Sequence, residues 1–323
     1  MLISSHFKAA WWLTNRHMQT IAAKWLRRNE KLNTLIETIE LPDGDFIDIA
    51  WTEKPQADNN RPIVVILHGL EGSVDSHYVK GMLATLKQKG WIGLLMHFRG
   101  CSGRANRQAA AYHSGDTRDI TYLATMLKNN YPHCPLFLIG FSLGGNVVAR
   151  YIAHNVNNPF TAATIVCAPS HLASCSLRIN QGFSKLYQSY LVNMLKNSTQ
   201  LKIDSQLITT INTTALKKVK TMKEFDQLVT APINGFKDAD DYYHQMSGLN
   251  NLTSIVQQCL IIHAIDDPFL NHQEIISNEL LPQNITFELT EKGGHMGFIT
   301  GNNPLKPIYW LEERIPTFIE QFL

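Results

Sequence analysis

The sequence Gly140-Phe141-Ser142-Leu143-Gly144 decides the fold of this chain. It follows a short apolar run at residues 136–139 and precedes an apolar, helix-like segment at residues 146–153. This order predicts a buried strand, a sharp strained turn and a helix, with the Ser142 hydroxyl projecting above a sheet. Glycine is expected on both sides because a Cβ atom there would collide with the neighbouring strand and helix. The alternative is an ordinary tight turn that happens to contain a serine.

Length and composition exclude several classes of protein. The chain has 323 residues, enough to bury a large core without a metal or disulfide, and its net charge of +2 favours neither nucleic acid nor an acidic partner. Its five cysteines are scattered without a C-x-x-C pair, so we expect reduced thiols in a cytoplasmic protein and no metal site. Neither a Walker A motif nor G-x-G-x-x-G occurs, so no cofactor is expected.

The N-terminal region allows two interpretations. Residues 1–8 lack the apolar core of a signal peptide, and no stretch approaches the ~20 apolar residues of a transmembrane helix. Residues 11–28 (WWLTNRHMQTIAAKWLRR) mix tryptophans, leucines and basic residues, a composition found in interfacial membrane helices. The apolar stripe is short for an anchor, which favours an arm packed on the catalytic body, with Arg27 and Arg28 at a helix C-terminus.

The rest of the chain alternates strand and helix patterns. Residues 35–41 and 46–51 flank a turn and predict a hairpin. Further strands are predicted at residues 63–67, 91–96, 136–139, 162–167, 259–264 and 285–289, and helices at 76–89, 116–129, 272–280 and 305–322. This alternation predicts an α/β fold, with a mostly parallel twisted sheet and helices on both faces.

Between residues 170 and 258 the alternation stops, and helical patterns replace it. We therefore predict an N-terminal arm (1–34), a core formed by residues 35–169 and 259–323, and a helical insertion at residues 170–258, called the cap below. An insertion at this point lies over the carboxyl edge of the sheet, where sites of open α/β folds are built. The cap contains a lysine run at residues 217–223. We interpret it as a solvated helix face rather than as a site that docks to an anionic surface.

A serine nucleophile needs a base, and the base needs an acid that orients it. On this type of fold the order along the chain is serine, acid, histidine. His295 follows the last strand in a glycine-rich loop, so it is the predicted base. Asp267 is the predicted acid, three residues beyond the end of a strand and just before Pro268. Asp266 remains a competitor, with bracing of the loop as its other role.

Hydrolysis through a tetrahedral intermediate also requires two N–H donors for the oxyanion. The first is predicted at Leu143, directly after the serine and at the start of a helix. The second is predicted at Leu70, in the His68-Gly69 loop after the strand at 63–67. In the loop at residues 98–104, Arg99 and Arg104 are expected to tie loops to carboxylates rather than bind an anionic ligand, and Cys101 to be a packed small residue.

With these residues placed, the sequence resembles the α/β-hydrolases, specifically their YheT-like branch. The motifs that carry the resemblance run over nearly the whole chain: 15–20 (NRHMQT), 41–45 (LPDGD), 68–73 (HGLEGS), 97–103 (HFRGCSG), 112–115 (YHSG), 140–146 (GFSLGGN), 263–269 (HAIDDPF) and 293–295 (GGH). The resemblance implies hydrolysis of carboxylic esters by a triad of Ser142, Asp267 and His295. Membrane-anchored relatives carry an N-terminal transmembrane helix; this chain departs from them and is expected to be soluble. The His-x-x-x-x-Asp element linked to acyl transfer in some relatives does not occur in the sequence, which argues against that activity.

Three functions follow from this pattern. The leading hypothesis is an esterase that acts on short- to medium-chain acyl esters through an acyl-enzyme, with a small-molecule ester as its partner. The second uses the same residues to pass the acyl group to an alcohol or thiol. The third is a binding protein without catalytic activity, which predicts a missing triad residue. An apolar stripe in the cap, at Phe183, Leu186, Tyr187, Tyr190 and Leu191, is expected either to line the acyl pocket or to attach the cap to the core.

Overall fold

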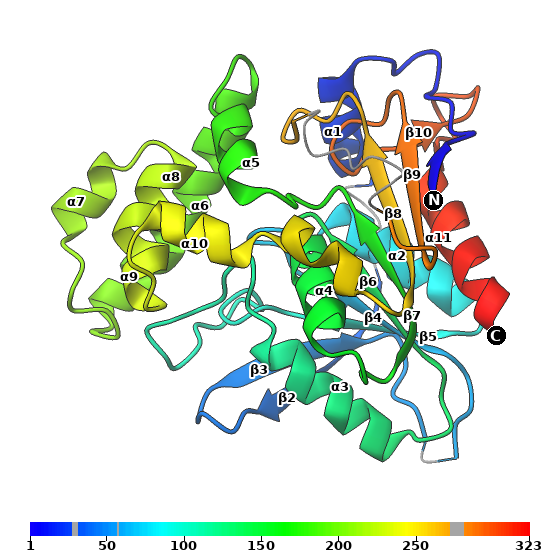
Figure 1. Cartoon of the computed structure of the whole chain (residues 1–323), viewed down its shortest axis with the longest axis horizontal. Helices are drawn as coiled ribbons and strands as arrows, with labels where there is room; N and C mark the ends of the chain where they lie inside the picture. The colour runs from blue at the N-terminus through cyan, green and yellow to red at the C-terminus, as the bar shows by residue number, and fades with distance from the viewer. Residues whose placement is uncertain (28–31, 57, 272–280) are drawn as a thin grey trace.

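A sheet of nine strands organises the computed structural model of the chain, which describes residues 1–27, 32–56, 58–271 and 281–323 (Figure 1). The order across the sheet is β1-β9-β8-β7-β6-β4-β5-β3-β2. Its strands are β1 (Leu2–Ser4), β2 (Leu35–Glu40), β3 (Phe46–Trp51), β4 (Ile63–Leu67), β5 (Ile92–Met96), β6 (Leu136–Phe141), β7 (Phe160–Val166), β8 (Gln258–Ala264) and β9 (Ile285–Thr290). In this order, each strand from β1 across the sheet to β5 pairs in parallel with its neighbour. At the other edge, β3 pairs antiparallel with β5 and with β2, and β2 and β3 form the predicted hairpin. The predicted fold class is therefore confirmed.

One edge of the sheet differs from the prediction. Residues 1–34 were expected to form an arm outside the sheet, but β1 pairs with β9, with Ile3 opposite Glu288. Ser5 extends this attachment, since its hydroxyl donates to Glu288 at 2.6 Å. A strand of three residues shows too little alternation to be recognised from its sequence.

The helix that follows the first strand, α1 (Arg16–Leu26), packs on the body of the molecule, as the favoured interpretation predicted. The buried Gln19 side chain donates to the carbonyl oxygens of Leu13 and Ile299 at 2.9 Å. Arg27 ends the helix, is buried and pairs with Glu312. In the part of the chain that the structure describes, no helix combines the length and apolarity needed to cross a membrane.

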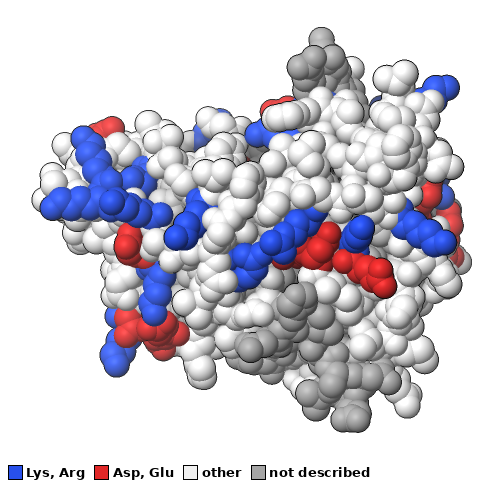
Figure 2. Space-filling view, turned by 90° about the horizontal axis from the view of Figure 1, so that it is seen from above, with Lys and Arg blue, Asp and Glu red and all other residues white. Residues whose placement is uncertain are grey.

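The region between β7 and β8, the cap, consists of helices. They are α5 (Leu172–Ile179), α6 (Ser184–Asp204), α7 (Thr213–Lys218), α8 (Met222–Phe225), α9 (Ala231–Ile233) and α10 (Ala239–Met246), with a π-helical turn at Asp226–Thr230 and a 3-10 segment at Gly248–Ser254. Most of them gather at one end of the molecule (Figure 1). Basic side chains cluster at the same end in the view from above (Figure 2). Within the lysine run, Lys217 and Lys218 are exposed and Lys223 pairs with Asp240, as expected of a solvated helix face.

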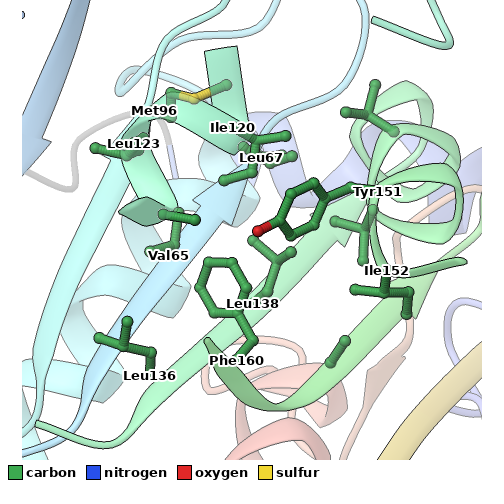
Figure 3. Packing of buried hydrophobic residues seen from close by; sticks show 14 of the residues in the cluster. Val65, Leu67, Met96, Ile120, Leu123, Leu136, Leu138, Tyr151, Ile152 and Phe160 are labelled. Atoms are coloured by element: carbon green, nitrogen blue, oxygen red, sulfur yellow. The ribbon is translucent and has the colours of Figure 1, made fainter. Parts of the chain in front are cut away.

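Two pairs of helices cover the sheet and explain its burial. α3 (Arg118–Asn130) and α4 (Leu143–His154) pack on the face that receives Val65 and Leu67, while α2 (His77–Gln88) and α11 (Trp310–Ile319) pack on the face that receives Val64 and Ile66. Successive strand residues point to opposite faces, so β4 is apolar throughout. Figure 3 shows the packing on the face that receives Val65 and Leu67, where side chains from α3 and α4 meet those of the strands.

The C-terminal helix is shorter than predicted. A helix over residues 305–322 was expected, but a short ribbon of β10 (Ile299–Thr300) and β11 (Ile308–Tyr309) precedes α11, and a 3-10 turn at Glu320–Phe322 follows it. The prediction was wrong at its start because Ile308 pairs with Thr300, a contact between segments that local periodicity does not encode. The helix predicted at residues 272–280 lies outside the described residues.

Candidate active site

Ser142 lies at the turn between β6 and α4. Its backbone has φ 51° and ψ −120°, a region that non-glycine residues rarely occupy. Two backbone hydrogen bonds hold this conformation: the Ser142 N–H donates to Val166 O at 2.8 Å, and the Gly145 N–H donates to Ser142 O at 2.8 Å. The strained turn lifts the hydroxyl above the end of the sheet and places it at the N-terminus of α4.

The two glycines of the turn are required by close packing. A Cβ atom on Gly140 would lie 2.4 Å from the carbonyl oxygen of Gly144, within the helix that follows. A Cβ atom on Gly144 would lie 2.4 Å from the carbonyl oxygen of Leu67, on the neighbouring strand β4. The expected collisions with helix and strand are therefore confirmed, and they explain why the turn tolerates no larger residue at these positions.

His295 lies in the loop after β9, and its two ring nitrogens join two of the predicted site residues. Nε2 is 2.9 Å from Ser142 Oγ, and Nδ1 is 2.8 Å from Asp267 Oδ2. The ring packs edge-on against Phe269, with centroids 4.1 Å apart, and is 5% exposed. The structure thus brings Ser142, His295 and Asp267 into one chain of hydrogen bonds, although they are far apart in the sequence.

The neighbouring aspartates Asp266 and Asp267 have different partners. The Asp267 side chain is fully buried, and its second oxygen, Oδ1, accepts the Phe269 N–H at 2.8 Å. Asp266 instead accepts the Gly294 N–H at 2.9 Å, and burial raises the pKa of its carboxyl. In this geometry Asp267 faces His295, while Asp266 braces the loop that carries it.

The two predicted oxyanion donors border the same cavity as Ser142. Among the described residues, the backbone N–H groups of Leu70 and Leu143 have no hydrogen-bond partner. Leu143 is the first residue of α4, where an N–H has no acceptor inside its own helix. The loop that carries Leu70 approaches Ser142 closely, since a Cβ atom on Gly69 would lie 3.2 Å from the Ser142 Cβ.

Hydrogen bonds fix the backbone on either side of Leu70. The Gly69 N–H donates to the Tyr78 hydroxyl, and the Glu71 N–H donates to the Tyr112 hydroxyl, both at 2.8 Å. Glu71 has φ 51°, so this loop is strained like the serine turn. Neither tyrosine was predicted from the sequence to support this loop, although Tyr112 lies in the motif at residues 112–115 and Tyr78 in the helix predicted at residues 76–89.

His68, at the base of this loop, is a structural residue in its neutral form. The Phe98 N–H donates to its Nε2 at 3.1 Å, so Nδ1 carries the proton and donates to Gly69 O at 2.6 Å. Burial lowers the pKa of His68 to about 3, which keeps the ring uncharged. The Gly144 N–H donates to His68 O at 3.1 Å and ties this loop to the serine turn.

The arginines of residues 98–104 are engaged by carboxylates. Arg99 donates to Asp119 at 2.8 and 2.6 Å and to Asp43 at 2.7 Å, and Arg104 pairs with Asp48. Neither points a free guanidinium into the site, which confirms that they tie loops together. Cys101 packs against the core, and burial raises the pKa of its thiol, as expected of a packed small residue.

One cluster has the residue types of a metal site. Within the described residues, the potential ligand atoms of Cys167, Asp267 and His295 all lie within 4.8 Å of one another. Both His295 nitrogens already face hydrogen-bond partners, and burial raises the pKa of Cys167 well above its usual value, so the thiol stays protonated. The hydrogen bonds of the site explain the cluster, because both His295 nitrogens are engaged in them.

A cavity of about 690 Å³ opens above Ser142, between the core, the cap and α1. Its lining includes the apolar side chains of Leu172, Ile179, Leu191, Leu195 and Phe225. The predicted cap stripe divides here, because Tyr187, Tyr190 and Leu191 line the cavity, whereas Phe183 and Leu186 do not and are 51% and 61% exposed. Neither of the two roles predicted for the stripe therefore describes it as a whole.

Sequence reasoning missed a contribution from α1. The Thr20 hydroxyl accepts the His295 N–H at 3.0 Å, and a Cβ atom on Gly294 would lie 2.5 Å from the carbonyl oxygen of Arg16. The N-terminal helix therefore supports the loop that presents His295. Its sequence, NRHMQT, was part of the resemblance, but nothing in it identified this contact.

Comparison with known proteins identifies the family. The model of the alpha/beta hydrolase fold family matches residues 62–302. The chain is 45% identical over 312 residues to "Putative esterase YheT" of Escherichia coli (strain K12), covering 96% of this chain and 92% of that protein. It is 25% identical to Phospholipase ABHD3 of Mus musculus, over 92% of this chain and 74% of that protein.

Solved structures agree in fold. The chain superposes on the Pyrococcus furiosus esterase Pf2001 with a TM-score of 0.58 and 18% identity, covering 93% of this chain and 92% of that one. At this identity the likeness shows the fold alone. Together with the family match, it leads to one conclusion: the chain belongs to the α/β hydrolase fold family, in its YheT-like branch, and is a hydrolase of that class.

Proposed function

We propose that this hydrolase is a serine esterase that cleaves carboxylic esters through an acyl-enzyme on Ser142. The observation that carries the proposal is the chain of hydrogen bonds from Ser142 Oγ through His295 to Asp267, at 2.9 and 2.8 Å. A serine, a histidine and a buried carboxylate in this order form an activated nucleophile. The open N–H groups of Leu70 and Leu143 beside the serine add the second requirement of acyl transfer.

In the first half-reaction, Ser142 Oγ attacks the ester carbonyl carbon while His295 Nε2 takes the hydroxyl proton. The buried Asp267 holds the ring through Nδ1 and stabilises the imidazolium that forms. The N–H groups of Leu70 and Leu143 donate to the oxyanion, each worth about 10²–10³ in rate. Collapse of the intermediate breaks the bond between the carbonyl carbon and the alcohol oxygen, and His295 returns its proton to the departing alcohol.

In the second half-reaction, a water molecule takes the place of the alcohol. His295 removes its proton as the water oxygen attacks the acyl carbon, and the same oxyanion donors act again. The bond to Ser142 Oγ then breaks, Oγ recovers a proton from His295, and the carboxylic acid leaves. The free enzyme is restored without any cofactor.

The cavity supports short- to medium-chain acyl esters as substrates. Its volume of about 690 Å³ is in the usual range for small-molecule sites, and its lining is mainly apolar around a few polar groups. The names of the relatives, an esterase at 45% identity and a phospholipase at 25%, support an acyl ester as the substrate class.

A fluorophosphonate probe tests the proposal. It should form one covalent adduct, and peptide mass spectrometry should place that adduct on Ser142. Failure of the folded protein to react, or reaction at another serine, would overturn the proposed nucleophile. Product analysis with added methanol distinguishes the outcomes of the second step: free acid alone supports hydrolysis, whereas methyl ester as the main product would assign acyl transfer to the same site.

A further inference from the structure

Two helices near the cavity leave large apolar side chains about half exposed to solvent. Met18 and Trp25 of α1 are 46% and 66% exposed. Leu186 and Tyr190 of α6, with Phe183 at its start, are 61%, 53% and 51% exposed. Single exposed apolar residues are normal on a protein surface, but a contiguous group marks an interaction site. We call these five residues the rim patch.

Contacts between α1 and α6 make the patch continuous. His17 Nδ1 lies 3.2 Å from the Tyr187 hydroxyl, and the His17 ring packs on Phe183 with centroids 4.5 Å apart. About two turns further along α1, Lys24 Nζ donates to the Tyr190 hydroxyl at 3.4 Å. Side chains of α1 and α6, which are more than 150 residues apart in the sequence, contact each other here, so the exposed residues beside them share one face.

The rim patch lies at the mouth of the cavity that contains Ser142. Lys24 and Trp25 from α1 and Tyr190 from α6 line the cavity and are themselves exposed, so the cavity reaches the surface between the two helices. A molecule that covers the rim patch therefore has direct access to the nucleophile.

The two sequence segments that carry the rim patch are basic. Residues 1–29 and 172–203 contain nine of the 29 basic residues of the chain and none of its 27 acidic residues. The basic residues are Lys8, Arg16, Lys24, Arg27, Arg28, Arg178, Lys185, Lys196 and Lys202. Near the rim patch, Arg16, Lys24 and Lys185 are exposed, and within the described part of the chain no carboxylate pairs with them. The view from above, toward α1 and α5, shows a largely uncharged surface crossed by basic side chains, with acidic ones among them (Figure 2).

We propose that α1 and the first turns of α6 dock on an anionic phospholipid bilayer and bring the cavity mouth to the lipid surface. Exposed tryptophan, tyrosine and aliphatic side chains flanked by basic residues match the boundary between lipid headgroups and acyl chains. The exposed Arg16, Lys24 and Lys185 beside the rim patch give charge complementarity to an anionic surface. The inference concerns binding, and it stands or falls independently of the proposed esterase activity.

Vesicle co-sedimentation of the full chain carrying Ser142→Ala tests the proposal without lipid turnover. The protein should sediment with phosphatidylcholine vesicles that contain about 30% phosphatidylglycerol, and much less with phosphatidylcholine alone. Raising the salt concentration should weaken the binding, because it screens the attraction between basic side chains and the surface.

Matched variants locate the surface. Leu186→Ser should lower the partition coefficient about tenfold by removing apolar contact area, and Lys185→Glu at least about fivefold by removing a basic contact. Leu201→Ser is the apolar control, since Leu201 is 65% exposed on the same helix but outside the rim patch. Lys217→Glu is the charge control on the exposed end of α7. Neither Leu186 nor Lys185 lines the cavity, so turnover of a soluble ester should be unchanged.

Three results would overturn the proposal. The first is no binding to either vesicle. The second is an equal or larger loss in Leu201→Ser or Lys217→Glu than in the rim variants, at unchanged melting temperature. The third is a concentration-dependent dimer that Leu186→Ser dissociates, since the rim patch would then contact a second copy of the chain instead of lipid.

Discussion

Replacement of Asp267 by asparagine is the sharpest test of how the site orients its histidine. In the structure the Phe269 N–H donates to Asp267 Oδ1 at 2.8 Å, while Oδ2 faces His295 Nδ1. In Asp267→Asn the Phe269 N–H still needs an acceptor, so the amide oxygen takes the place of Oδ1. The amide NH₂ group must then face Nδ1, so that nitrogen becomes an acceptor and the ring proton moves to Nε2. A protonated Nε2 cannot take the proton of Ser142.

The expected loss is therefore that of a histidine held in the wrong tautomer. It amounts to about 10⁴ in kcat, equivalent to about 5 kcal/mol in the activation free energy. The side chain keeps its volume in a fully buried site, so the fold should survive. The assay is turnover of p-nitrophenyl butyrate, with melting temperature and circular dichroism as measures of folding.

Asp266→Asn is the matched control one residue away. Asp266 accepts the Gly294 N–H rather than facing His295, and an amide oxygen can accept the same bond, so kcat should fall less than about tenfold. If Asp266→Asn loses more activity than Asp267→Asn in folded proteins, the assignment of the orienting acid is wrong.

Further predictions concern the turn, the cavity and the cap. Gly144→Ala places a Cβ 2.4 Å from the Leu67 carbonyl oxygen, so urea titration should show a free energy of unfolding lower by at least about 3 kcal/mol. Leu191→Ala should change the ratio of kcat/KM between long- and short-chain p-nitrophenyl esters by about 1–3 kcal/mol, whereas Leu186→Ala, outside the cavity, should leave the ratio as it is. Burial raises the pKa of Asp226 to about 6, so the folded state keeps a proton that the unfolded chain releases above about pH 4. The stability of the wild type relative to Asp226→Asn should therefore fall as the pH rises from about 4 to 6, by up to about 3 kcal/mol, as measured by urea titrations of both proteins.

The elements that sequence reasoning predicted best are those whose signal is local. The strand before Ser142, the turn and the helix after it each follow from their own residues, because buried strands are apolar throughout and the turn excludes a Cβ at Gly140 and Gly144. The hairpin β2–β3 is local in the same sense, with turn residues between two alternating runs.

The features that escaped prediction depend on contacts between distant segments. The support of His295 by Thr20 joins positions 275 residues apart, and the pairing of β1 with β9 spans nearly the whole chain. Helical periodicity placed Leu186 and Leu191 in one stripe, but it does not reveal which neighbour covers which side. In the structure one lines the cavity and the other faces outward.

The most direct test of the central claim is ester turnover by Ser142→Ala. Alanine fits the strained turn as serine does, so the variant should fold with an unchanged melting temperature. We expect it to hydrolyse p-nitrophenyl butyrate at no more than about 10⁻³ of the wild-type kcat, because the oxyanion donors alone remain. A folded Ser142→Ala protein with wild-type turnover would contradict the account, since the chemistry would then take place elsewhere.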